Sequence, residues 1–193
     1  MNRYEFAVQQ NKLYKNDSNL VYVGSCVYRE HVIIGENCKI KPGAVLGYEG
    51  FGFERDEEGV PFRIPHIGKV NIGDNVEIGA NTVIARGTVN DTIIEDNVKI
   101  DDMVFIAHNC KIGKNTLIIA GSIICGSVII GKNCWIGAGC CIKEKVVIGD
   151  GAIIGIGAIV IKDVPAGVTI AGMKAQSLEG MKKLAQFIEI NNI

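Results

Sequence analysis

The chain has 193 residues, of which 48% are hydrophobic and 21% charged, and its formal net charge is −1. This length suits one domain with a full core, so we expect a single domain over residues 1–193. No apolar run approaches the roughly 18 residues that cross a bilayer, and balanced charge gives no attraction for nucleic acid or a membrane surface. The N-terminus lacks the pattern of a secretory signal. We therefore expect a cytoplasmic protein that binds neither nucleic acid nor membrane.

Residues 1–20 predict only an N-terminal cap, and a repeat of six residues occupies most of residues 21–165. An aliphatic residue stands at every sixth position in one long series: Ile94, Ile100, Ile106, Ile112, Ile118, Ile124, Ile130, Ile136, Ile142, Ile148, Ile154 and Val160. Four positions after each of these comes a small or β-branched residue, and glycine often follows the aliphatic residue directly. A period of six matches neither a helix nor a lone strand. It predicts a short strand plus a turn, three of which form a triangular coil with the aliphatic residue inside, the small residue at the corner and glycine supplying backbone freedom.

Two insertions shift this pattern, at about residues 48–66 and 85–93. The first is polar, glycine-rich and aromatic, unlike the rest of the chain. Loops that interrupt a rigid solenoid commonly carry binding function. We therefore expect Phe51 and Phe53 to offer stacking faces to a substrate, with His66 beside them.

The seven cysteines are interpreted as reduced thiols without a metal. Cys38, Cys110, Cys134 and Cys140 occupy the small-residue corner position, where a thiol acts as a compact apolar filler, and no Cys-x-x-Cys motif occurs. The repeat fails after Val160. The spacing of apolar residues beyond it predicts a short C-terminal α-helix at about residues 177–190.

His108 is the strongest candidate for catalysis. One coil of 18 residues beyond it stands Gly126, which would place a backbone N–H without a side chain about one strand spacing away. A general base beside an exposed N–H is what acyl transfer to an amine requires, because the amine must lose a proton and the oxyanion needs a donor. Asp101 is a weaker candidate for orienting the imidazole. The three histidines are separated by 35 and 42 residues, which is not a zinc-ligand spacing, so we expect no metal.

The segments GFGF, RIPHIGKVNIGDNVEIGANTVIARGTVNDT, IAHN and AGSIICGS together resemble the UDP-3-O-acylglucosamine N-acyltransferases of lipid A biosynthesis over residues 34–160. The resemblance implies an all-β fold: a left-handed parallel β-helix of hexapeptide repeats. It also implies a homotrimer with active sites between subunits. Carried over to this chain, the general base is His108 and the oxyanion-binding glycine is Gly126.

The chain also departs from that family. The family has an N-terminal domain that holds uridine, whereas this chain begins almost directly with the β-helix. A family histidine near the acyl chain aligns with Lys145, and a family aspartate aligns with Ala85, beside Arg86, a further candidate for substrate binding. In shorter relatives an Ala-Gly-x-x-Ala element like residues 171–175 lies near the cofactor, so we expect Lys145, Lys162 and Lys174 to contact the donor.

These departures favour a shorter enzyme: an N-acyltransferase that moves an acyl group, acetyl or another short one, from acyl-CoA to the amine of a nucleotide-linked amino sugar for surface polysaccharide or lipopolysaccharide synthesis. Three alternatives stay open. They are a lipid A type enzyme dependent on acyl carrier protein, an O-acetyltransferase, and a non-catalytic trimeric scaffold, since the repeat alone is structural.

Overall fold

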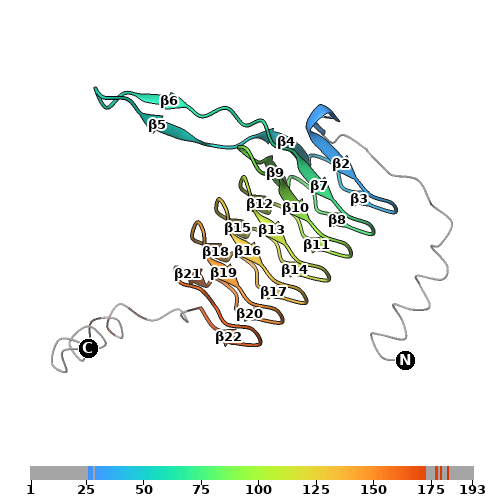
Figure 1. The fold of residues 1–193 in the computed structure, drawn as a ribbon. Coiled ribbons are helices and arrows are strands. Elements are labelled where there is room, and N and C mark those ends of the chain that lie inside the picture. Colours follow the sequence, from blue (N-terminus) through green and yellow to red (C-terminus); the bar gives the residue numbers. More distant parts are fainter. Residues whose placement is uncertain (1–25, 28, 173–176, 178, 180–181, 183–193) are drawn as a thin grey trace.

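The computed structural model describes residues 26–27, 29–172, 177, 179 and 182. These residues form a stack of coils whose strands line up in three parallel sheets (Figure 1). The predicted N-terminal cap lies outside the described residues, as does the predicted helix at 177–190 apart from Ser177, Glu179 and Lys182. No helix among the described residues is long and apolar enough to cross a membrane.

The three sheets each take one strand from successive coils. Sheet 1 contains β1 (Cys26–Val27), β4 (Val45–Glu49), β9 (Val83–Arg86), β12 (Phe105–Ile106), β15 (Ile123–Ile124), β18 (Cys141–Ile142) and β21 (Ile159–Val160). Sheet 2 contains β2 (Val32–Ile34), β7 (Val70–Ile72), β10 (Thr92–Ile94), β13 (Lys111–Ile112), β16 (Ile129–Ile130) and β19 (Val147–Ile148). Sheet 3 contains β3 (Lys39–Ile40), β8 (Glu77–Ile78), β11 (Lys99–Ile100), β14 (Leu117–Ile118), β17 (Trp135–Ile136), β20 (Ile153–Ile154) and β22 (Thr169–Ile170). A short 3-10 helix, η1 (Arg29–His31), precedes β2.

The core is the column of inward aliphatic side chains that the period of six predicts. Every member of the predicted series from Ile94 to Val160 is buried, and so are the small corner residues four positions later, the four predicted cysteines included. Paired strands are 18 residues apart in the regular coils, as in Leu117 with Trp135. Stacking buries each coil against its neighbours, so the core is continuous.

The glycine that follows the aliphatic residue has a different role from the one predicted. Left-handed backbone falls instead three positions after the aliphatic residue, on asparagines such as Asn115 (φ 60°) and on other glycines such as Gly139 (φ 65°). A Cβ at Gly113 would lie 2.6 Å from the carbonyl carbon of Gly131 in the next coil. Glycine is therefore required at Gly113 because adjacent coils approach closely there, not because the turn needs a positive φ.

The β-helix continues beyond the predicted end at residue 165. β22 pairs in parallel with β20, with Ile154 opposite Ile170. Pro165 and Gly167 form a further corner, where the Val168 N–H donates to the Pro165 carbonyl at 3.3 Å. The repeat does not end at these two residues, because proline and glycine both suit a turn between strands.

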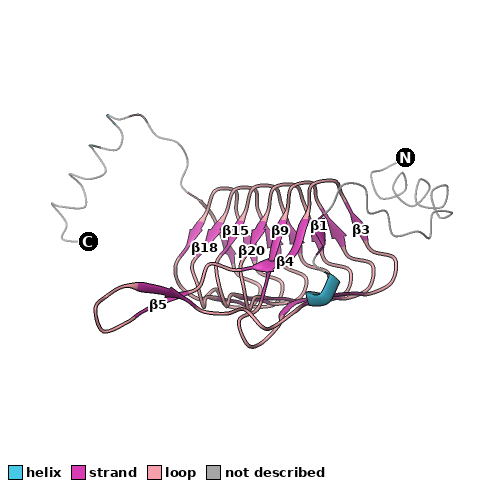
Figure 2. Cartoon of the chain, turned by 90° about the horizontal axis from the view of Figure 1, so that it is seen from above, coloured by secondary structure: helices cyan, strands magenta, loops and turns pink. Residues whose placement is uncertain are grey.

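The first insertion is an antiparallel hairpin, made of β5 (Phe53–Arg55) and β6 (Pro61–Arg63). It projects away from the coil stack (Figures 1 and 2). The second insertion is shorter than predicted, since β9 ends at Arg86 and β10 begins at Thr92. Both insertions leave the prism next to the same corner, between sheets 1 and 2.

Candidate active site

His108 lies at that corner, immediately after β12, and its side chain is half-buried. The next residue, Asn109, has a φ of 61°, a conformation that asparagine tolerates better than most residues. In this turn the Asn109 Oδ1 lies 2.8 Å from the His108 Nδ1. The partner of the imidazole is thus its neighbour in sequence.

The contacts of Asn109 fix the tautomer of His108. The Thr88 N–H and hydroxyl donate to the Asn109 Oδ1 at 3.2 and 2.9 Å, and the Asn109 Nδ2 donates to the Asn90 carbonyl at 2.7 Å. A backbone N–H only donates and a carbonyl only accepts, so the amide has one consistent orientation. Oδ1 must accept from His108, which places the proton on Nδ1 and leaves a lone pair on Nε2.

Gly126 lies one coil below His108 in the same column. Ile106 pairs with Ile124, and the Ser127 N–H donates to the His108 carbonyl at 2.9 Å. A Cβ at Gly126 would lie 2.9 Å from the His108 Cε1 and 3.0 Å from its Nε2. Within the described residues the Gly126 N–H donates to no protein group. The basic nitrogen therefore lies against a glycine whose N–H is free, as predicted from the spacing.

His66, at the end of the first insertion, packs against the base. The two imidazole rings meet edge-on, with centroids 5.3 Å apart and planes at 76°. His66 is only 2% exposed, and its Nδ1 lies 3.0 Å from the Ile64 carbonyl. Burial, above all, lowers the pKa of His66. A direct contact of His66 with substrate, as predicted, does not fit this burial within one chain.

Arg86 lies beside His66 at the same corner. Its Nε donates to the His66 carbonyl at 2.8 Å, and its other nitrogens donate to the Gly47 carbonyl at 3.2 Å and the Glu49 carboxylate at 2.8 Å. Its side chain is 12% exposed. Because these bonds use three of the five guanidinium N–H groups, Arg86 holds the insertion in position, and its contact with a substrate stays a prediction.

Phe51 and Phe53 do form an exposed aromatic pair at the base of the hairpin. Phe51 is 85% exposed, and the two ring centroids are 4.8 Å apart. The Arg63 guanidinium carbon lies 4.7 Å above the Phe53 ring and its Nη1 lies 3.4 Å from the Gly50 carbonyl. Stacking of a substrate on these rings stays a prediction.

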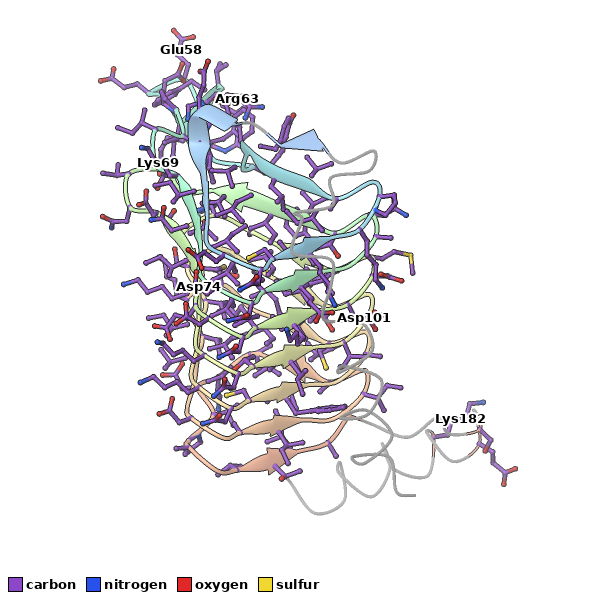
Figure 3. The ribbon with its side chains drawn as sticks, turned by 90° about the vertical axis from the view of Figure 1, so that its right-hand side faces the viewer. Glu58, Arg63, Lys69, Asp74, Asp101 and Lys182 are labelled. Atoms are coloured by element: carbon purple, nitrogen blue, oxygen red, sulfur yellow. The ribbon has the colours of Figure 1, made fainter. Side chains whose placement is uncertain are left out.

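Asp101 lies at a different corner, between sheets 3 and 1. Figure 3 shows it at the edge of the stack, well away from Arg63 at the hairpin end. Its carboxylate accepts hydrogen bonds from the Asp102 and Ala120 N–H groups at 2.8 and 3.3 Å. Within one chain it does not reach His108, and Asn109 holds the position that we predicted for it.

The three candidate lysines have different surroundings. Lys145 is exposed on the corner between sheets 1 and 2, where His108 also lies, and its N–H donates to the Gly126 carbonyl at 3.0 Å. Lys162 is exposed farther down the stack. Lys174 lies outside the described residues. Among the described residues no group of three or more metal-ligating side chains occurs.

Sequence reasoning did not identify four residues that build this corner: Gly50, Thr88, Asn90 and Asn109. Only Asn109 carried a signal, because a polar residue next to a candidate base is a natural orienting partner. Gly50, Thr88 and Asn90 come from the two insertions, whose paths do not follow from the repeat.

Comparisons with known proteins agree with this picture. Residues 127–162 match the family described as bacterial transferase hexapeptide (six repeats). Over 159 residues, 82% of this chain, the sequence is 49% identical to a UDP-3-O-acylglucosamine N-acyltransferase of Legionella pneumophila, of which it covers 46%. A protein of the same name from Shewanella denitrificans is 55% identical over 96 residues, 50% of this chain and 28% of that protein. The chain thus spans about half the length, or less, of these relatives.

Solved structures share the fold. The Francisella novicida UDP-N-acetylglucosamine acyltransferase superposes with a TM-score of 0.65 at 21% identity, over 88% of this chain and 72% of that one. The acetyltransferase domain of PglB from Neisseria gonorrhoeae, in complex with acetyl coenzyme A, gives a TM-score of 0.50 at 19% identity, over 91% of this chain and 66% of that one. The predicted left-handed parallel β-helix is confirmed. In its repeat, its fold and the part of these relatives that it matches, the chain is similar to hexapeptide-repeat acyltransferases.

Proposed function

We propose that this protein transfers an acyl group from a thioester to the amine of a nucleotide-linked amino sugar. The observation that carries the proposal is the His108 Nε2, with its lone pair set by Asn109, lying against Gly126, whose N–H is free among the described residues. The name of the relatives, UDP-3-O-acylglucosamine N-acyltransferase, supports a nucleotide sugar as the acceptor and an amide as the product.

The geometry suits each part of the reaction. As the amine nitrogen attacks the thioester carbonyl, the His108 Nε2 takes a proton from that nitrogen, since its lone pair is free. The carbonyl oxygen becomes an oxyanion, which the Gly126 N–H can stabilise because no Cβ blocks its approach. The attack has already formed the C–N bond; collapse of the oxyanion re-forms the C=O bond and breaks the C–S bond, and the thiolate leaves with the proton from His108. The Asn109 Oδ1 stabilises the imidazolium through Nδ1–H.

We propose acyl-CoA with a short acyl chain as the donor and acyl carrier protein as the alternative. A β-helix of the same fold, the PglB domain, binds acetyl coenzyme A. Lys145 is exposed and its N–H donates to the Gly126 carbonyl, which supports its side chain as a candidate contact for a phosphate of such a donor. We also propose that the protein is a cytoplasmic homotrimer with its acceptor held between subunits and acts in the synthesis of surface polysaccharide or lipopolysaccharide.

The test is a product screen. Purified protein and its His108→Ala variant are incubated with acetyl-CoA, longer acyl-CoAs and acylated carrier protein, against UDP-, dTDP- and GDP-linked amino sugars and UDP-3-O-acylglucosamine. Mass spectrometry identifies the product, and mild alkali distinguishes a stable amide from a labile ester. We expect one donor and one amino sugar to give an amide, and the His108→Ala rate to fall by roughly 10²- to 10⁴-fold.

The outcomes separate the alternatives. An alkali-labile product would assign an O-acyltransferase. An amide formed only from acyl carrier protein and UDP-3-O-acylglucosamine would assign a lipid A type enzyme. No product with any pair from a folded protein, or an unchanged rate after His108→Ala, would contradict the proposal, and the former would favour a scaffold.

A further inference from the structure

His66 is a second histidine beside the base, and the proposed reaction does not use it. Its ring is 2% exposed, and its Nε2 is fully enclosed without a hydrogen-bond partner among the described residues. A buried polar atom without a partner costs free energy, so its presence calls for a reason. A phenylalanine of similar size would fill the space without that cost.

The tautomer of His66 follows from its surroundings. Its Nδ1 lies 3.0 Å from the Ile64 carbonyl, which can only accept, so Nδ1 carries the proton and Nε2 a lone pair. The ideal Cβ position of Gly50 is 2.8 Å from this Nε2 and 2.9 Å from the His108 Cδ2. The His66 Nε2 and the His108 Cδ2 therefore border the same narrow space, which the missing side chain of Gly50 leaves open.

Burial, His108 and Arg86 lower the pKa of His66, whereas the hydrogen bond to Ile64 and the Glu49 carboxylate raise it. Arg86, on β9, donates to the His66 carbonyl and to Glu49 on β4. Arg63, on β6, lies 3.9 Å from the same carboxylate. The Glu49 carboxylate is thus shared between the two arginines. A positive charge on the His66 ring would also lie beside His108. Burial lowers the pKa of His66, in agreement with a ring that stays neutral.

We propose that His66 is a positioning residue for the base: a permanently neutral imidazole that fixes the edge of the His108 ring and stabilises it with its Nε2 lone pair once His108 is protonated. This inference rests on the proposed function for its catalytic consequence, but not for its structural content. Protonation makes the Cδ2–H edge of His108 more positive, so a lone pair beside that edge becomes more favourable in the protonated state. A hydrocarbon ring at residue 66 would pack equally well and lack this effect.

Histidine NMR tests the inference without activity. The chain has three histidines, so single substitutions assign each imidazole resonance. In the wild-type protein we expect His66 to keep the Nδ1–H tautomer and not to titrate between pH 5.5 and 8. Titration of His66 in that range, or the Nε2–H tautomer, would overturn the proposal whether or not the protein is an acyltransferase.

Two variants test the role of the lone pair. His66→Phe keeps the ring and removes the lone pair, whereas His66→Gln keeps an acceptor. In His66→Phe we expect the acid limb of kcat/KM to move by about 0.5 pH unit to lower pH, with kcat reduced about 5-fold. We expect His66→Gln to restore most of both. A folded His66→Phe protein whose acid limb of kcat/KM matches that of the wild-type protein would overturn the proposal. If neither variant folds, the wild-type titration decides.

Discussion

The regular coils from Ile94 to Val160 and the interrupted coils above them have the same arrangement of strands, but their corners make different contacts. In the regular coils polar corner groups tie one coil to the next, as where the Lys132 N–H donates to the Asp150 carboxylate at 2.8 Å. Beside the interrupted coils, Gly50 and His66 of the first insertion lie against His108, which follows Ile106 of the regular series. The repeat thus supplies a rigid support, and the insertions convert one of its corners into a candidate site. The comparison implies that stability and catalysis can be damaged separately.

The largest expected effect is on stability, in the regular coils. Ile118, on β14, is fully buried, so Ile118→Ala should lower the free energy of unfolding by about 2–5 kcal/mol. Ile156 is 75% exposed, and Ile156→Ala should cost less than about 0.5 kcal/mol. Urea unfolding at one protein concentration measures both. Equal losses for the two variants would contradict the stacked core, and folded Ile118→Ala should keep the wild-type kcat.

The next effect is on catalysis at nearly constant stability. Asn109 and Asn115 both have left-handed backbone, with φ of 61° and 60°, but only Asn109 contacts His108. Alanine should add the same backbone strain at either position. We expect Asn109→Ala to lower kcat/KM by roughly 10- to 100-fold, because the imidazole loses the partner that sets its tautomer. Asn115→Ala should leave kcat/KM unchanged, and a similar loss there would attribute the effect to strain alone.

A smaller effect separates contact with both histidines from contact with His66 alone. A Cβ at Gly50 would press on His66 and His108, whereas at Gly52 it would lie 3.0 Å from the His66 Cε1 and would not touch His108. Neither glycine has a positive φ, so alanine adds no backbone strain. We expect Gly50→Ala to lower kcat about 10-fold by displacing the base, and Gly52→Ala to lower it less. The reverse order would show that His108 is not held by this contact.

The smallest effect is the pH dependence of stability. The pKa of His66 is lowered in the folded protein, so below its ordinary value of about 6.5 the unfolded chain binds more protons than the folded one. This contribution is complete above pH 6.5 and falls as the pH drops below it. Between pH 7.5 and 5.5 the melting temperature of the wild-type protein should therefore fall more than that of His66→Gln. Parallel curves would show that His66 is protonated equally in both states.

The candidate catalytic pair was within reach of the sequence, whereas the residues that support it were not. His108 and Gly126 are one coil apart, so counting residues places them together once the coil length is known. Asp101 was predicted to orient His108 because the two residues are close in sequence. Asp101 lies instead at the preceding corner, between sheets 3 and 1, and the strand β12 separates it from His108. Asn109 orients the base because the left-handed turn brings its amide back onto the preceding ring, a local geometry that residue spacing does not reveal.

The sequence by itself determined the coil, the buried column and the register, because a side chain at every sixth position can be buried throughout only if the chain turns after each short strand. Only the tertiary structure decided what surrounds the base. Arg86 binds the His66 carbonyl and Glu49, and His66 is buried against His108 rather than exposed. Insertions obey no period, so their contacts are fixed by the corner onto which they fold, and that corner exists only after the coils have stacked.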